Sequence, residues 1–171
     1  MNVPMSEFDI LQAYNGGPLQ IYLRSYFDDL TILPERPFIV LYELRPMSGH
    51  WILVHDVRTS ANKSRRGYSI EFYDSYGLVP DSERAYISPL FPDLHDNRAN
   101  LLRLLYKEAR GRVVFNDMAV QNPTSSTCGR HCLMRLYCAN LDIDSYNAML
   151  AHYATVWKLT PDEIALILVP A

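Results

Sequence analysis

The chain has 171 residues, of which 49% are hydrophobic and 20% charged, and its formal net charge is −3. These values are typical of one ordinary globular domain with a buried core, and a slightly acidic chain has no overall basic field for nucleic acid. No apolar run approaches the length of a membrane span, and the start at Met1–Pro4 does not resemble a signal peptide.

We therefore expect residues 1–171 to form a single domain that works as a monomer, without a membrane. The cysteine count indicates the compartment. Three cysteines, an odd number, lie between positions 128 and 138. Such a set argues against a disulfide framework, so we expect a reducing compartment.

The first half of the chain has the patterns of a short helix and several strands. Ser6 can cap a helix over the residues that follow it, and positions 15–18 stop that helix. Continuous apolar runs at 38–42 and 51–54 predict buried strands, and the alternation at 68–73 predicts a half-buried one. The polar, basic segment 58–67 is predicted to be a hairpin-like loop.

A helix and a further strand are predicted beyond position 95. Asp96 can cap a helix through Leu101–Ala109, and Gly111 can end it as the C′ residue. Residues 112–115 then predict a strand that leads into the loop at Gln121.

The last part of the chain is predicted to be helical. One helix begins near Cys128 and buries one side, Asp144 can cap the next, and Thr160–Glu163 forms a capping box with Pro161 at the first helical position. The apolar positions of the first two helices are Leu133, Leu136 and Tyr137, and Met149, Leu150, Tyr153 and Trp157. The whole pattern predicts an α+β domain in which a mostly antiparallel sheet packs against helices.

Four polar side chains carry the candidate chemistry. Cys128–Gly129 stands directly before a helical run, with Gln121 seven positions upstream, and His50–Trp51 and Asp74 precede them. The chain order is histidine, aspartate, glutamine and cysteine. These are the parts of a thiol protease: a base, an orienting acid, an oxyanion donor and a nucleophile.

The segments 49–51, 74–77, 121–129 and 128–132 resemble the adenovirus maturation protease family (adenain) and the wider clan that includes the Ulp1-type proteases. The spacing from Gln121 to Cys128 and the proline at position 123 are more similar to the adenovirus form. The resemblance implies the same α+β fold, with the nucleophile at the N-terminus of a central helix.

We expect Cys128 to act as the nucleophile. At the first turn of its helix, capped by Ser126 or Thr127, it would meet free amides and a positive dipole end, which favour the thiolate. A protonated histidine nearby would lower the pKa of the thiol further. Gly129 would let the substrate backbone come close, because it has no side chain.

His50 is predicted to be the base, because it enters a strand where a cleft can open and matches the His-Trp pair of the family. His55 on the opposite face of that strand and His131 on the helix of Cys128 are the competitors. Trp51 is expected to pack into the core.

Asp74 is predicted to orient the imidazole of His50 and stabilise its charged form. The gap between the two residues is longer than the family usually has, so Glu71 and Asp56 remain alternative acids. Gln121 would donate its side-chain amide to the oxyanion, beside the backbone N–H of Cys128.

Two further interpretations concern ligands. Cys128, Cys132 and His131 could ligate zinc, but a structural site needs a second ligand pair, and the chain offers none. Lys63, Arg65 and Arg66 form a basic cluster, and the adenovirus enzyme uses DNA and an activating peptide as cofactors. Contact with DNA through this cluster is therefore an implication of the resemblance, while the commoner role of such a run is a solvated loop.

The sequence thus predicts a cysteine endopeptidase that cleaves viral capsid and core precursors during virion maturation, after a small residue such as glycine. It would work in the cytoplasm or virus factory of an infected cell and be packaged in the virion. The alternatives are an isopeptidase of the Ulp1 type for SUMO or ubiquitin-like modifiers, an acetyltransferase of the YopJ type, and an inactive binding module.

Overall fold

The computed structural model describes residues 3–45, 48–57, 69–81, 100–110 and 112–170. Its elements, in chain order, are α1 (Glu7–Ala13), β1 (Gln20–Leu23), the 3-10 helix η1 (Arg24–Phe27), β2 (Phe38–Arg45), β3 (Ser48–Val57), β4 (Ser69–Tyr73), α2 (Asn100–Glu108), β5 (Val113–Phe115), α3 (Cys128–Tyr137), α4 (Ile143–Trp157) and α5 (Pro161–Leu168). The loop at 58–67, the Lys63, Arg65 and Arg66 cluster, Asp96 and Gly111 lie outside the described residues.

The five strands form one sheet in the order β1-β2-β3-β4-β5. β2 and β3 pair antiparallel, as do β3 and β4, whereas β1 runs parallel to β2 and β4 runs parallel to β5. The α+β class is confirmed, but the prediction of a mostly antiparallel sheet is wrong because the sheet is mixed. Parallel neighbours need a crossover connection, and η1 and α2 lie in the two connections that supply it.

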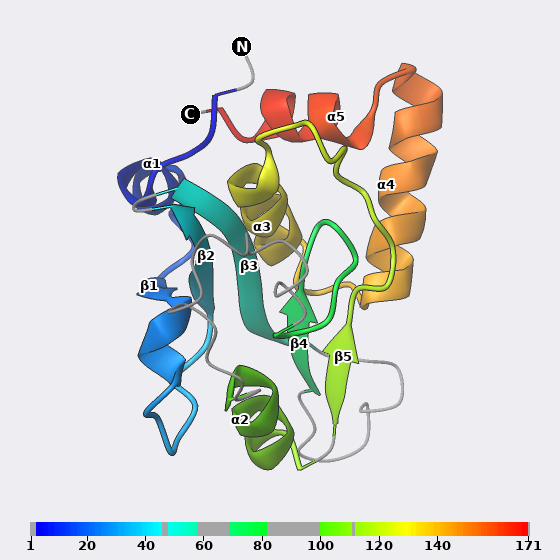
Figure 1. The fold of residues 1–171 in the computed structure, drawn as a ribbon. Helices are drawn as coiled ribbons and strands as arrows, with labels where there is room; N and C mark the ends of the chain where they lie inside the picture. Colours follow the sequence, from blue (N-terminus) through cyan, green and yellow to red (C-terminus); the bar gives the residue numbers. More distant parts are fainter. Residues whose placement is uncertain (1–2, 46–47, 58–68, 82–99, 111, 171) are drawn as a thin grey trace.

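Helices cover both faces of the sheet (Figure 1). One core joins α1, α3, α4 and α5 to the sheet through residues such as Leu41 and Leu53, and the other joins η1 and α2 through residues such as Val40 and Val54. Successive strand residues point to opposite faces, so a strand between two helical layers is apolar at every position. This explains the continuous apolar runs of β2 and β3.

All five residues of β4 are buried, so the prediction of a half-buried strand is wrong. The charged residue that produced the alternation, Glu71, is fully buried and pairs with two groups. Arg135 of α3 donates to it through two nitrogens at 2.7 and 3.0 Å, and the Nε2 of His55 lies 2.6 Å from it. A buried carboxylate needs such partners, and here they join β3, β4 and α3.

The helix ends agree with the sequence in two cases and differ in a third. Ser6 and Thr160 each form the predicted capping box of α1 and α5. Asp142, not Asp144, caps α4 and accepts a hydrogen bond from the Ser145 N–H at 2.8 Å. The helix therefore begins at Ile143, two residues earlier than a cap at Asp144 predicts.

Three aromatic residues predicted to be buried are substantially exposed. Tyr137 of α3 is 48% exposed, and Tyr153 and Trp157 of α4 are 40% and 45% exposed. Tyr153 and Trp157 pack on each other, with ring centroids 4.8 Å apart. Helical spacing alone cannot distinguish a core stripe from an aromatic pair on the surface.

Helix α3 is the most enclosed helix in the part of the chain that the structure describes, since every residue from Cys128 to Leu136 is buried. Its charged side chains are satisfied inside the protein. Arg130 donates to the carbonyl of Val169 at 3.1 Å and to the carbonyl of Val3 at 2.8 Å. The helix that carries Cys128 is thus fixed to the sheet on one side and to both end segments on the other.

Candidate active site

The N-terminus of α3 lies where β3 begins and β4 ends. Cys128 is the first residue of α3, His50 is the third residue of β3, and Asp74 directly follows β4. Neighbouring antiparallel strands place the start of one beside the end of the other. The sheet therefore brings His50 and Asp74 together, and the packing of α3 on β3 adds Cys128.

Gly49 secures the local geometry before His50. β2 and β3 pair here, with Tyr42 opposite His50 and Glu43 opposite Gly49. A Cβ atom on Gly49 would lie 1.9 Å from the Tyr42 carbonyl oxygen, well inside contact distance. Only glycine fits this position, so its presence lets β3 approach β2 at the point where the histidine enters the site.

Asp74 and Tyr76 hold the His50 ring. The Nε2 of His50 lies 2.9 Å from the Oδ1 of Asp74, which also accepts the Tyr76 backbone N–H at 2.7 Å. The Tyr76 ring stacks on the imidazole, with centroids 4.5 Å apart and planes 25° from parallel. A carboxylate at one nitrogen and an aromatic face both favour the protonated ring.

Cys128 and His50 are close enough for each to shift the pKa of the other, through a side-chain hydrogen bond and through charge. Because Asp74 occupies Nε2, the nitrogen left for the thiol is Nδ1. The backbone amides of Trp51 and Gly129 also bond to the sulfur. Cys128 is 6% exposed, so these interactions act with little screening by solvent.

The pKa shifts of Cys128 and His50 favour an ion pair between the two side chains. Burial alone would raise the pKa of Cys128, but the hydrogen bond and charge of His50, with the two amides, lower it below its ordinary value. Burial would lower the pKa of His50, but Asp74 and the Cys128 thiolate outweigh it and raise the pKa to about 9. Both shifts therefore favour a thiolate on Cys128 beside an imidazolium on His50.

The competing histidines and acids point elsewhere. His55 pairs with Glu71 at 2.6 Å on the α3 face, and His131 pairs with Asp162 at 3.0 Å. Asp56 pairs with Arg36 at 2.5 Å, so neither alternative acid reaches the His50 ring. Asp74 is the acid that faces it.

The other two cysteines have different surroundings. The Cys132 thiol is fully buried and lies 3.4 Å from the Trp51 carbonyl oxygen, and burial raises its pKa well above the ordinary value. Burial also raises the pKa of Cys138. Among the described residues, no group of three or more histidine, cysteine, aspartate or glutamate side chains is arranged to hold a metal ion.

Gln121 lies on the loop that leads into Cys128, and its side chain is fixed in the interior. Its Oε1 accepts the Ser75 hydroxyl at 2.6 Å, and its Nε2 donates to the Ser125 carbonyl at 3.1 Å. The backbone N–H of Gln121 donates to the Ser75 carbonyl at 3.1 Å. An amide nitrogen carries two hydrogens, so one remains for a ligand. Ser75 directly follows Asp74 and thus joins the acid to the Gln121 loop.

Two details of the predicted cysteine environment are wrong. Thr127 occupies the N-cap position, but within the described residues its side chain makes no cap bond: its backbone, with φ −103° and ψ 5°, is not in the extended conformation of a capping residue, and its hydroxyl donates to Asp162. Gly129 faces the core rather than a cleft, since a Cβ there would lie 3.3 Å from both the Met5 and Trp51 side chains. The absent side chain serves the packing of α3 on β3.

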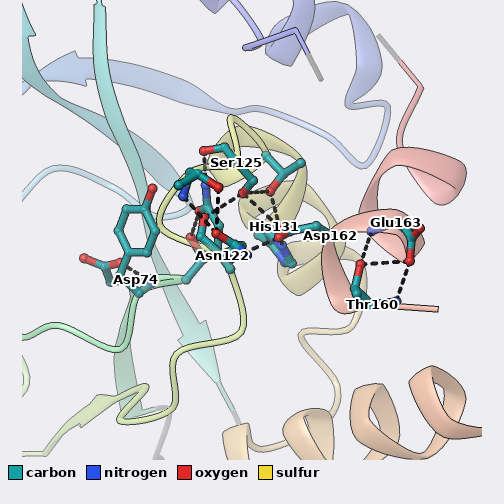
Figure 2. Close-up of polar contacts among 12 residues, drawn as sticks. Asp74, Asn122, Ser125, His131, Thr160, Asp162 and Glu163 are labelled. Carbon is teal, nitrogen blue, oxygen red and sulfur yellow. Dashed lines mark hydrogen bonds and ion pairs between the residues drawn. The ribbon is translucent and has the colours of Figure 1, made fainter. Parts of the chain in front are cut away.

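Tyr76, Ser75 and Asp162 are site residues that sequence reasoning missed. Tyr76 lies two residues after Asp74, in the same segment that identified the acid, so the sequence could have indicated it. Asp162 lies in the capping box of α5, which predicted a helix start and nothing else. Its contacts with the loop before Cys128 are drawn in Figure 2.

A small, mainly apolar cavity lies beside Trp51, the residue after His50. It is lined by Ser6 and Glu7 at the start of α1, by residues 21–23 of β1, and by Leu41 and Trp51. Leu41 and Trp51 are direct partners in the β2–β3 register. The cavity opens on the face of the sheet against which α3 packs.

The site is that of an α+β domain in which an imidazole is hydrogen-bonded to a carboxylate and shares its electrostatic environment with a buried thiol. The chain is 29% identical to the Sputnik virophage protein named Uncharacterized protein V9, over 172 aligned positions that cover 97% of this chain and 94% of that protein. This similarity suggests a viral origin. No family model and no solved structure matches the chain. Within the described residues, no helix is both long and apolar enough to cross a membrane.

Proposed function

We propose that the protein is a cysteine endopeptidase of the adenain-like type that cleaves viral structural precursors. The observation that carries this proposal is the series Cys128–His50–Asp74, in which the thiol and the carboxylate occupy the two sides of one imidazole. The similarity to a virophage protein over nearly the whole chain supports the viral setting. The spacing from Gln121 to Cys128 supports the maturation type.

The reaction begins with attack of the Cys128 thiolate on a peptide carbonyl carbon. The carbonyl π electrons move to oxygen, and the oxyanion is stabilised by the Cys128 backbone N–H and the remaining hydrogen of the Gln121 amide. The tetrahedral intermediate then expels the amine, which takes a proton from His50. A thioester on Cys128 is left.

Water completes the cycle. His50, now neutral, takes a proton from the water as the oxygen attacks the thioester. Collapse of the second intermediate releases the new carboxyl group and regenerates the thiolate beside the imidazolium. Asp74 remains ionised throughout and keeps the ring oriented. One water is consumed for each peptide bond.

The substrate class follows from resemblance and from the cavity. Cleavage after a small residue such as glycine is expected of this clan. The apolar cavity beside Trp51 offers a place for a neighbouring aliphatic side chain of the substrate. The setting would be the virus factory of an infected cell and the virion itself.

The test uses the purified protein and the structural precursor proteins encoded by the same virus. Mass spectrometry should detect discrete cleavage products, with a new C-terminus at a small residue, and the Cys128→Ala variant should give none. An unchanged precursor set, with and without DNA or virion peptides added, would contradict the proposal. Release of ubiquitin-like modifiers from conjugates, with the precursors intact, would favour the isopeptidase.

A further inference from the structure

Asp162, at the start of α5, contacts the loop between Gln121 and Cys128. One carboxylate oxygen accepts the Asn122 backbone N–H at 2.9 Å. The other accepts the hydroxyls of Ser125, at 3.2 Å, and Thr127, and it pairs with the Nε2 of His131 at 3.0 Å. Figure 2 shows these donors converging on Asp162.

Two of the donors to the Asp162 carboxylate lie next to the two proposed oxyanion donors in the sequence. Asn122 directly follows Gln121, and Thr127 directly precedes Cys128. The side chain thus ties down both ends of the segment that separates the two proposed oxyanion donors. Among the described residues, the hydrogen bonds and the ion pair of Asp162 involve neither the Cys128 sulfur nor the His50 ring.

Asp162 is itself held firmly. Pro161 occupies the first position of α5, and the capping box between Thr160 and Glu163 fixes the first turn of the helix. An anion in the first turn is favoured by the helix dipole. Burial would raise the pKa of Asp162, but the bonds from His131, Thr127 and Asn122 outweigh it and lower the pKa, so the group is charged at neutral pH.

The segment between its two ends is also ordered by internal bonds. Ser125 donates its N–H to the Asn122 carbonyl at 2.9 Å, its hydroxyl oxygen lies 2.9 Å from the same carbonyl oxygen, and its own carbonyl accepts the Gln121 amide. These bonds order the segment internally. Ser75 holds the Gln121 end of this segment, and the contacts with Asp162 join the segment to α5.

We infer that Asp162 is a positioning residue that sets the Gln121 amide and the Cys128 backbone N–H at the separation an oxyanion needs. The inference rests on the proposed peptidase function. Asp162 should affect one step of the reaction, the stabilisation of the oxyanion. The other step, formation of the Cys128 thiolate, depends on His50 and should be unaffected.

The first test compares Asp162→Asn with the parent protein. The substitution keeps the shape and removes the charge. We expect kcat to fall by about ten- to a hundredfold, because small misplacements of preorganised donors have effects of this size, while KM changes by less than about threefold. The rate of Cys128 alkylation by iodoacetamide, which needs no oxyanion donor, should stay within about threefold of the parent.

The matched control is Glu163→Gln. Glu163 is the neighbouring carboxylate, and its side chain bonds Thr160 at the cap of α5 rather than the Gln121 loop. A general loss of α5 stability would appear in both variants. A fall of kcat in Asp162→Asn with near-parent kcat in Glu163→Gln supports the inference.

A second variant covers the case in which Asp162→Asn does not fold. Thr127→Val removes one hydroxyl from the carboxylate with little change of shape. It should lower kcat in the same direction and by a smaller factor, again without slowing alkylation. Where both single variants fold, the double variant should fall no further than Asp162→Asn, because both changes break the same contact.

The outcomes separate the two claims. The inference is overturned if Asp162→Asn or Thr127→Val has the same kcat as the parent protein. It is also overturned if alkylation and cleavage slow by the same factor. A parent protein that cleaves no precursor overturns the proposed function instead. In that case amide hydrogen exchange over residues 122–128 decides the positioning claim: faster exchange in Asp162→Asn supports it, and unchanged exchange overturns it.

Discussion

Three thiols on or beside one helix differ because their neighbours differ. Burial would raise the pKa of Cys128, but its interactions with His50 and with two backbone amides lower it below the ordinary value. Cys132, one helical turn later, lies against a carbonyl oxygen in an apolar layer, and its pKa is raised. Cys128 and Cys132 are the same residue type on the same helix, so the difference between their pKa values comes from the groups that surround each thiol.

Removing the thiols one at a time tests this difference. Cys128→Ala should abolish peptide-bond cleavage, whereas Cys132→Ala and Cys138→Ala should retain most of it, because only Cys128 contacts the imidazole. Cleavage of a precursor-derived peptide, followed by chromatography, measures each variant. An equal loss in Cys132→Ala, in a variant that is still folded, would contradict the assignment of the nucleophile.

The pH dependence follows from the same pair. Activity should rise with pH as Cys128 deprotonates, at a lower pH than for an ordinary thiol, and fall through about 9 as His50 loses its proton. Asp74→Asn removes a charge that holds the proton on the ring, so the alkaline limb should move to lower pH by about one to three units. The profile of kcat/KM against pH measures both limbs. An unmoved alkaline limb in Asp74→Asn would mean that another group titrates there.

At the scale of elements, the site depends on how closely β3 can approach β2. Gly49→Ala would place a Cβ against the Tyr42 carbonyl and force the strands apart beside His50. We expect a loss of about 1–3 kcal/mol in the free energy of unfolding, with a larger relative loss of cleavage than that destabilisation explains. Urea denaturation and peptide cleavage, measured on the same preparation, provide the comparison.

The control for this prediction is Gly17→Ala. Gly17 has a φ of 123°, so an alanine there is strained, but its Cβ would meet no atom within 4 Å of the described structure. That variant should lose stability through backbone strain and keep its cleavage rate. Similar behaviour of the two variants would show that Gly49 has no special relation to the site.

The elements also show which features a sequence can predict. The caps of α1 and α5 and the start of α3 at Cys128 are encoded within a few neighbouring residues, and all three were predictable. The link between Asp162 and Asn122 spans 40 positions, and the pair of Arg135 with Glu71 spans 64. No local pattern contains them, because tertiary packing decides which polar groups meet.

The same reasoning applies to the candidate site. His50, Asp74 and Cys128 could be selected because a motif surrounds each of them, and the structure brings these three together. The parallel outer strands could not be predicted, since strand direction depends on where the chain crosses over. The role of Gly129 in packing, rather than in substrate access, became visible only with Met5 and Trp51 in place.

At the scale of the whole molecule, the question is which macromolecule the site accepts. We predict cleavage of the structural precursors of the protein's own virus, without processing of ubiquitin or SUMO conjugates. The relative is a virophage protein of nearly the same extent, and the spacing of Gln121 and Cys128 is similar to the maturation type.

Activity probes can distinguish these substrates. A vinyl-sulfone probe built on ubiquitin or SUMO should leave Cys128 unlabelled, while iodoacetamide at neutral pH should alkylate it faster than it alkylates an ordinary thiol. Mass spectrometry of the labelled peptide gives both results. Efficient labelling by either modifier probe would favour the isopeptidase, and failure of every reagent would indicate an inactive domain or one that awaits an activator.

The attachment of Arg130 to both end segments bears on when activity can arise during synthesis. Its bond to Val3 spans 127 positions, and its other bond reaches Val169 near the opposite end of the chain. Contacts so distant in sequence form only after most of the chain has been made and has closed its long loops. The nucleophile should therefore gain its reactivity late in folding, which would protect a nascent chain from premature cleavage. Rapid alkylation of Cys128 in a refolding experiment should accordingly appear together with the final native signal, and earlier labelling would show that the site assembles independently.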